Sequence, residues 1–147
     1  MLTIQTWLDG YIFYEKMVKE LERKKHEALQ DAIRITSCPK SAAVQQSRGN
    51  STENRNVRYI DKIDRLNAQI IEMQEYMNAV ESAVATVKTG KDRMLLQLKY
   101  IEGESWEDVA EALDMSVKWV RGELHDRALR KIFYAAKDFI PAYCKYK

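Results

Sequence analysis

The stretch that decides the fold is SWEDVAEALDMSVKWVRGELHDRAL, residues 105–129. Its apolar residues recur at helical spacing in two short runs, which are separated by residues that favour a turn. The expected inward residues are Trp106, Val109, Ala110 and Leu113 in the first run, and Val120, Leu124, Ala128 and Ile132 in the second. Ser105 and Ser116 stand where helix N-caps are needed, and Asp114 tolerates the left-handed conformation of a tight turn. The pattern predicts a helix-turn-helix.

The two runs carry opposite charge. Residues 102–114 contain six acidic residues and no basic one, whereas residues 115–132 contain five basic and two acidic residues, a net charge of +3. In a helix-turn-helix the second helix enters the major groove of DNA, where a basic excess favours contact with phosphates. The first helix lies mostly across the back, where acidic residues need not meet DNA. The alternative is a solvated three-helix bundle with incidental charges.

Helix geometry indicates which side chains of the second helix would face DNA. With Val120, Leu124 and Ala128 inward, the residues expected to face outward and read base edges are Val117, Lys118, Arg121, Gly122 and His125. Arg121 is the best candidate because arginine can bond guanine O6 and N7 together. For His125, phosphate contact and simple exposure to solvent are both open. Trp119 either packs on the preceding helix or covers the DNA backbone.

Phosphate contacts have their own candidates, because such contacts position a protein on DNA without reading its sequence. They are Ser105, Ser116, Arg127, Arg130 and Lys131. The two serines are caps first, although exposed helix N-termini can also hold phosphates. For the three cations the alternative is a plain solvated face.

An a/d heptad stripe runs from Tyr59 to Val87 and predicts a long helix with one narrow buried seam. The seam residues are Ile63, Leu66, Ile70, Met73, Met77, Val80 and Val84. Their partner is either a helix predicted over residues 3–35, folded back as a hairpin, or the same helix of a second chain. We expect a homodimer, and the sequence leaves open whether the seam pairs within the chain or between chains.

The segment between these helices is polar. Residues 37–58 are rich in Ser, Asn and Gln and contain Pro39 and Gly49, which predicts a mobile loop. The basic residues Lys40, Arg48, Arg55 and Arg58 outnumber the single acid Glu53, so the segment is either a solvated linker or a basic arm that touches a polyanion. The expected domains are therefore a helical hairpin or coiled-coil region over residues 1–90 and a helix-turn-helix domain over residues 91–147.

Composition narrows the class of protein. The 147 residues include only 5 Gly and 2 Pro, which favours long helices and predicts an all-α fold. No apolar run approaches the roughly 18 residues of a membrane span, and the N-terminus lacks the features of a signal peptide, so we expect a cytoplasmic protein without a membrane partner. Cys38 and Cys144 lack metal-ligand spacing, and no glycine-rich phosphate loop is present. We therefore expect no metal, no cofactor and no enzymatic activity.

The segment LLQLKYIEGESWEDVAEALDMSVKWVRGELHDRALRKI, residues 95–132, resembles region 4 of the sigma-70 family, which reads promoter −35 elements. The matching features are L-x-L-x-Y-I-E-G, S-W-E-D-V-A, S-x-x-x-V-x-x-x-L-H and the final A-L-R-K-I. With its polar loop and VQxS-like patch at residues 44–47, the whole chain resembles the ArpU-type late-gene transcriptional regulators of phages of low-GC Gram-positive bacteria.

The resemblance implies a regulator of phage or prophage genes, late genes among them, that reads double-stranded DNA through the second helix. The alternative is a protein-interaction module that binds host RNA polymerase or another regulator and has little DNA binding of its own. The six acidic residues at 102–114 keep that alternative open, because an acidic surface can attract a basic protein surface.

Overall fold

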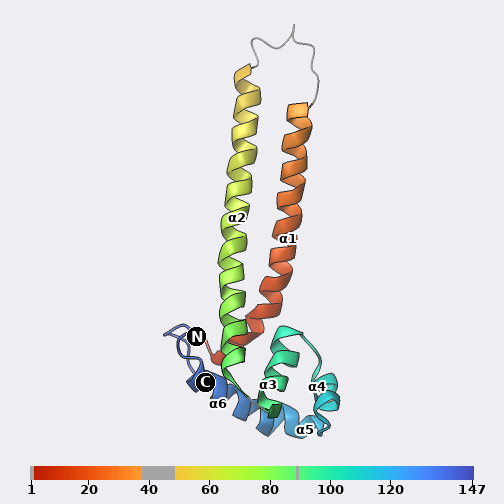
Figure 1. The fold of residues 1–147 in the computed structure, drawn as a ribbon, viewed down its shortest axis with the longest axis vertical. Coiled ribbons are helices and arrows are strands. Elements are labelled where there is room, and N and C mark those ends of the chain that lie inside the picture. The colour runs from red at the N-terminus through yellow and green to blue at the C-terminus, as the bar shows by residue number, and fades with distance from the viewer. Residues whose placement is uncertain (1, 38–48, 89) are drawn as a thin grey trace. The chain divides into compact units, whose positions relative to one another are not determined.

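A computed structural model describes residues 2–37, 49–88 and 90–147. This part of the chain is mostly helical and contains no strand, which confirms the predicted all-α class. The helices, which are labelled in Figure 1 where there is room, are α1 (Ile4–Ser37), α2 (Gly49–Thr86), α3 (Gly90–Leu96), the π-helix η2 (Gln97–Ile101), α4 (Trp106–Leu113), α5 (Val117–Trp119), the π-helix η3 (Val120–Leu124) and α6 (His125–Ala135).

The chain divides into two compact units. Unit 1 comprises Met1–Lys16 and Gln74–Lys147, and unit 2 comprises Met17–Met73. This division differs from the boundary expected near residue 90, because the beginning of α1 and the end of α2 belong with the helices that follow them. The apolar side chains of these segments share one core with α3 to α6.

The core of unit 1 is built from side chains of all its helical segments except α5, whose Trp119 is partly buried and packs against it. In Figure 1, α3 to α6 gather around the beginning of α1 and the end of α2. The largest fully buried side chains are those of Ile4, Leu8, Val80, Val84, Leu95, Leu96, Val109, Val120, Leu124 and Ile132. The two ends of the chain are joined by backbone hydrogen bonds: the Ile4 N–H donates to the Lys145 carbonyl at 2.7 Å, and the Lys145 N–H to the Leu2 carbonyl at 3.0 Å.

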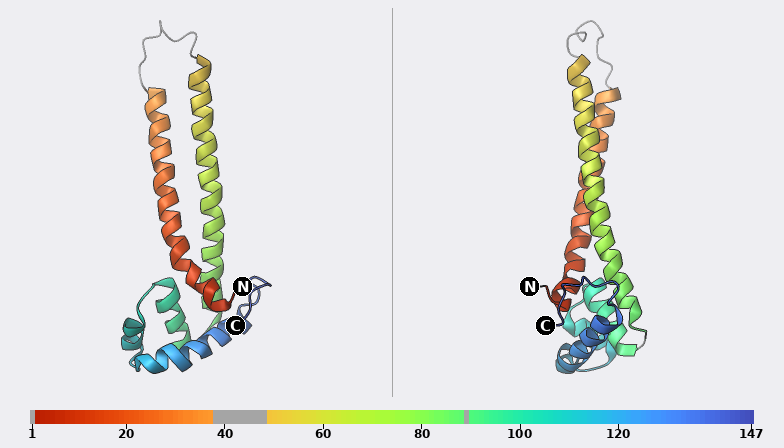
Figure 2. Two further views of the ribbon diagram at one scale, coloured as in Figure 1. Left: turned by 180° about the vertical axis from the view of Figure 1, so that it is seen from behind. Right: turned by 90° about the vertical axis from the view of Figure 1, so that its left-hand side faces the viewer.

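In unit 2, the later part of α1 and the earlier part of α2 lie side by side and run in opposite directions (Figure 2). Val18, Leu21 and Ala28 of α1 are buried, as are Leu66 and Ile70 of α2. Leu29 and Ile33 also fit the apolar spacing of α1 but are exposed. The buried surface of unit 2 is therefore a narrow strip along each helix.

The seam residues of α2 are all at least partly covered within one chain. Leu66, Ile70, Val80 and Val84 are buried, and Ile63, Met73 and Met77 are partly buried. Val80 and Val84 lie in the core of unit 1 and are at most 1% exposed. This part of the seam has no surface left for a second chain, so the expected homodimer gains no support from it.

The predicted loop is shorter than expected. Because α2 begins at Gly49, residues 49–58 are helical, and the prediction of a loop there is wrong. Asn56 lies three residues before Tyr59 and is partly buried, so it continues the spacing of the seam with a polar side chain. The apolar residues of the stripe begin only at Tyr59, so their spacing does not reveal the first turns of α2. The rest of the predicted loop, residues 38–48, lies outside the described residues.

Two neighbouring isoleucines of α2 test the seam. Ile70 is 6% exposed and Ile71 is 55% exposed. We expect Ile70→Ala to lower the free energy of unfolding by about 2–5 kcal/mol, because it deletes buried methyl and methylene groups. Ile71→Ala should stay within about 0.5 kcal/mol of the parent protein. Urea denaturation followed by circular dichroism measures both, and equal losses would contradict the assignment of the buried side.

Candidate nucleic-acid interface

The segment from α4 to α5 has the local structure that the sequence predicted. The Ser105 hydroxyl accepts the Asp108 N–H at 3.2 Å, and the Ser116 hydroxyl accepts the Trp119 N–H at 3.3 Å, so both predicted N-caps are confirmed. Asp114 adopts the left-handed conformation, with φ 54° and ψ 49°. Both serine hydroxyls are thus engaged by the helices they cap, and only the exposed helix N-termini remain for an anion.

The second helix is continuous through α5, η3 and α6, but it is not uniformly α-helical. The His125 N–H donates to the carbonyl of Val120, five residues back, which is the bond of a π-helical turn. Such a turn holds one residue more than an α-helical turn, so the residues after it are rotated relative to a regular helix. His125 is thereby brought round toward the buried side, next to Leu124.

His125 is buried, so the prediction that it faces outward is wrong. Only 7% of its surface is exposed, and its Nε2 lies 2.5 Å from the hydroxyl of Tyr100. The edge of the Trp106 ring packs against it, with ring centroids 4.8 Å apart. Burial lowers the pKa of His125; Asp126 opposes this shift and Lys99 adds to it. The neutral ring joins the second helix to η2 and α4 and is not available to DNA.

The other four candidate base-reading residues are exposed. Val117, Lys118, Arg121 and Gly122 of α5 and η3 are exposed, whereas Val120 in the same segment is fully buried. A Cβ added to Gly122 would meet no atom within 4 Å, so this side of the helix is open. A shallow hollow on it is lined by Ser116, Lys118, Trp119, Gly122 and Glu123. We refer to Val117, Lys118, Arg121 and Gly122 as the reading face.

Trp119 lies beside the reading face and is partly buried. It packs against the core of unit 1, and the guanidinium of Arg127 lies over its ring, 5.8 Å from the centroid. Of the two alternatives, packing or cover of the DNA backbone, the arrangement favours packing as the main role of Trp119.

Arg127 and Lys131 are engaged by an acid that the sequence analysis missed. Asp92 of α3 is buried, and its carboxylate accepts from Arg127 Nε at 3.0 Å and from Lys131 Nζ at 2.6 Å. Burial alone would raise the pKa of the Asp92 carboxyl, but the hydrogen bonds from Lys131 and Arg127 outweigh it and hold the pKa below its ordinary value. The two cations therefore fasten α6 to α3.

The position of Asp92 in the sequence indicates that it faces inward. It precedes Leu95 and Leu96 by three and four residues, so it lies on their side of the helix, and both leucines are fully buried. An acid at an inward position must be paired, which predicts a basic partner on a neighbouring helix. Arg130 of α6, by contrast, is exposed and forms no ion pair with any described side chain.

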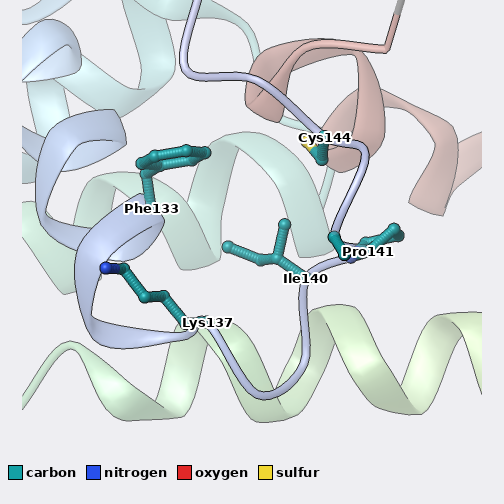
Figure 3. Close-up of a pocket in the computed structure, with 6 residues that line it drawn as sticks. Phe133, Lys137, Ile140, Pro141 and Cys144 are labelled. Carbon is teal, nitrogen blue, oxygen red and sulfur yellow. The ribbon is translucent and has the colours of Figure 1, made fainter.

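Unit 1 also contains a pocket at the C-terminal end, lined by Phe133, Lys137, Ile140, Pro141, Ala142 and Cys144 (Figure 3). Burial raises the pKa of the Cys144 thiol, which is the opposite of the shift that activates a cysteine nucleophile. Within the described part of the chain, no group of three or more His, Cys, Asp or Glu residues could hold a metal ion.

None of the described helices combines the length and the apolar character needed to cross a membrane. Comparisons of the chain with protein families, curated proteins and solved structures found no match.

The buried histidine makes the stability of the protein depend on pH. Because the pKa of His125 is lowered in the folded chain, the unfolded chain takes up the proton first as the pH falls. The contribution of the neutral His125 to the free energy of unfolding should be fully present above about pH 6.5, the ordinary pKa of histidine. It should decrease as the pH falls below that value. Urea denaturation at a series of pH values above and below about 6.5 should show this decrease in the parent protein. The control His26→Gln should show the same decrease because His26 is exposed, whereas His125→Gln should show a much smaller one.

The cations of α6 should differ in their effect on folding. Replacing Arg127 and Lys131 together by alanine leaves the buried Asp92 carboxylate without partners, which should cost about 3–5 kcal/mol of unfolding free energy. Arg130→Ala removes an exposed charge from the same helix and should change stability by less than about 0.5 kcal/mol. Thermal and urea denaturation compare the variants, and a stable double variant would mean that the ion pairs do not hold α6.

Proposed function

We propose that the protein is a sequence-specific DNA-binding transcription regulator that reads the major groove with the reading face of α5 and η3. The observation that carries the proposal is the exposure of Val117, Lys118, Arg121 and Gly122 in the first turns of the second helix, which follows the left-handed turn at Asp114. In a helix-turn-helix these are the positions at the N-terminal part of the second helix that contact base edges.

The chemistry of the reading face suits a groove edge. Arg121 can donate two hydrogen bonds to one guanine, Lys118 can bond a base or a phosphate, and Val117 can contact a thymine methyl group. Gly122 has no side chain, which would let the helix lie close to the DNA. The resemblance to sigma-70 region 4 and to the ArpU-type regulators agrees with this reading and suggests phage or prophage genes, late genes among them, as targets.

The charges that remain for phosphates are fewer than the composition suggested. Arg127 and Lys131 are balanced in part by Asp92, and Arg130 is the cation of α6 that we assign to a phosphate contact. Lys118 and Arg121 add positive charge at the other end of the same helix. Such a spread of cations supports contacts at both ends of the second helix.

A second function is favoured by a different surface. Glu107, Asp108 and Glu111 are exposed on α4 and form no ion pair with a described side chain. An acidic helix of this kind would repel DNA and attract a basic protein surface. The second candidate function is therefore a module that binds host RNA polymerase or another regulator, with little DNA binding of its own.

Two alanine variants test the assignment of roles on the second helix. Losing a bidentate guanine contact in Arg121→Ala should cost about 1–3 kcal/mol on the cognate duplex and little on a scrambled duplex. Losing a phosphate contact in Arg130→Ala should weaken binding to both duplexes alike and reduce the slope of log K against log salt by about 0.9. Fluorescence anisotropy across a salt series measures both quantities, on a cognate site first obtained by selection from random duplexes.

Circular dichroism serves as the fold control, since both side chains are exposed and neither should affect stability. Wild-type affinity of Arg121→Ala for the cognate duplex would show that the reading face is misplaced. If the parent protein shows no salt-dependent DNA binding at all, the polymerase-binding module takes the place of the DNA regulator.

A further inference from the structure

We propose that α2 carries a second binding site for DNA phosphates, in unit 2, formed by Arg55, Arg58 and Lys62 together with Tyr59. The site would bind the backbone of any sequence and would add to the contacts of the second helix. It rests on the proposed function in one respect, because it takes DNA as the polyanion. We refer to the four residues as the α2 basic site.

The helix places these side chains together. They line one hollow on the surface of α2. The three cations are spaced by three and four residues, so they lie on one side of the helix on successive turns and extend over about 10 Å. A DNA strand is a linear array of phosphates, and a row of cations of this length can contact more than one of them.

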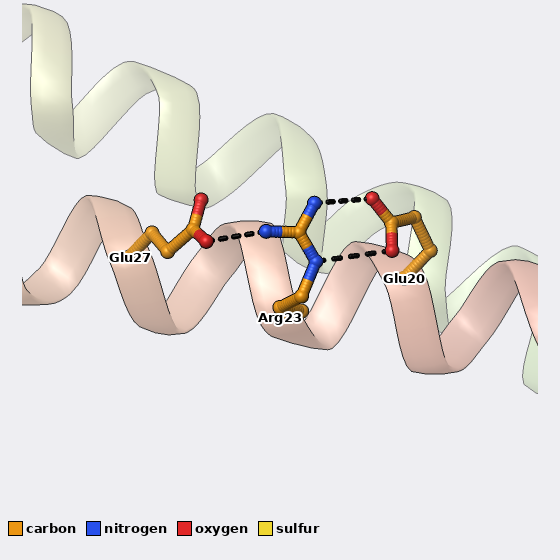
Figure 4. A network of polar contacts seen from close by, with 3 residues as sticks. All are labelled: Glu20, Arg23 and Glu27. Atoms are coloured by element: carbon orange, nitrogen blue, oxygen red, sulfur yellow. Dashed lines mark hydrogen bonds and ion pairs between the residues drawn. The ribbon is translucent and has the colours of Figure 1, made fainter.

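Among the described side chains, none pairs with the cations of the α2 basic site. Arg55, Arg58 and Lys62 are exposed, and no described acid forms an ion pair with any of them. Another arginine of unit 2 shows the contrast: Arg23 of α1 is held between Glu20 and Glu27, with its Nε donating to Glu20 at 3.0 Å (Figure 4). A phosphate could therefore bind the three cations of α2 without displacing a described acid. To bind Arg23 of α1, it would have to displace Glu20 and Glu27.

The described acids in this part of α2 fall outside the sector that carries the cations: Asp64 lies on another side of the helix, and Asp61 lies at the border of the sector, three residues after Arg58. At about 100° per residue, Arg55, Arg58 and Lys62 fall within a sector of about 60°, and Asp61 and Asp64 fall outside it. Arg65 falls next to the sector and extends it by a further turn, with its Nε donating to the Asp61 carbonyl at 3.4 Å. The positive charge is therefore confined to one side of α2, as contact with a polyanion requires.

The same geometry argues against a lipid surface as the partner. A helix that lies on a membrane buries apolar residues between its basic residues and the lipid. The exposed apolar residues nearby are Val57 and Ile60, which are 54% and 57% exposed. On the helix they lie about 120–180° from the middle of the basic sector. One flat surface cannot contact both groups at once, whereas a DNA strand needs only the cations.

Tyr59 suits the site for a separate reason. It belongs to the heptad stripe and is partly buried, so its ring is held at the edge of the hollow. No described group bonds its hydroxyl, which can donate a hydrogen bond to a phosphate oxygen. A neutral donor beside cations is a common composition of contacts to the DNA backbone.

The test uses the full chain and the salt dependence of binding to cognate and scrambled duplexes. We expect Arg58→Gln with Lys62→Gln to reduce the slope of log K against log salt by about 1.8, which is two phosphate contacts, and to weaken binding to both duplexes by the same factor. The matched control is Lys24→Gln with Lys25→Gln, which removes the same charge from α1 of the same unit and should leave the slope at its parent value. Arg58→Lys keeps the charge and should keep the slope.

The outcomes separate this proposal from the proposed function. Equal slopes for the two double variants overturn the α2 basic site, even if Arg121→Ala still loses sequence preference. A reduced slope in the α2 double variant alone supports the site, even if Arg121→Ala behaves as the parent and the reading face fails. A parent protein that binds vesicles containing an anionic lipid but no duplex overturns the site as a DNA contact. Unchanged thermal unfolding of both double variants confirms that folding is not the cause.

Discussion

The surface of the protein that we assign to DNA depends on the burial of one side of the second helix. Val120, Leu124, Ala128 and Ile132 have no exposed surface. Full burial of a valine, leucine or isoleucine side chain contributes about 1.5–3 kcal/mol, whereas an exposed ion pair contributes about 0–1 kcal/mol. The apolar side therefore decides how the helix is rotated, and the residues available to a partner are those left on the opposite side.

Two buried polar groups add precision to this arrangement. The Asp92 carboxylate fixes α6 against α3 through Arg127 and Lys131, and His125 links the beginning of α6 to Tyr100. Apolar packing tolerates small rotations, but a buried carboxylate or imidazole that loses its partner carries a large desolvation cost. These contacts restrict the helix to the rotation at which the reading face is exposed.

Local chemistry could be read from the sequence, and long-range geometry could not. The caps at Ser105 and Ser116 and the turn at Asp114 were predictable because each depends on a few adjacent residues. The burial of His125 was not, since it follows from a π-helical turn that no periodic pattern reveals. The early start of α2 was missed because Asn56 continues the seam with a polar side chain. Of the five residues predicted to read bases, four are exposed as expected, and His125 is buried.

The seam of α2 shows how one stripe can have two uses. Its later part lies in the core of unit 1 with the helices that precede and follow it, so that part cannot also hold a second chain. Its earlier part lies in unit 2, where the buried strip is narrow and the rest of each helix is exposed. In a helix with a narrow seam only a few positions are needed for packing, so the other sides of the helix can carry charged residues. On α2 one such side holds the basic residues 55, 58 and 62, so the same narrowness that limits the core of unit 2 makes a second charged surface available.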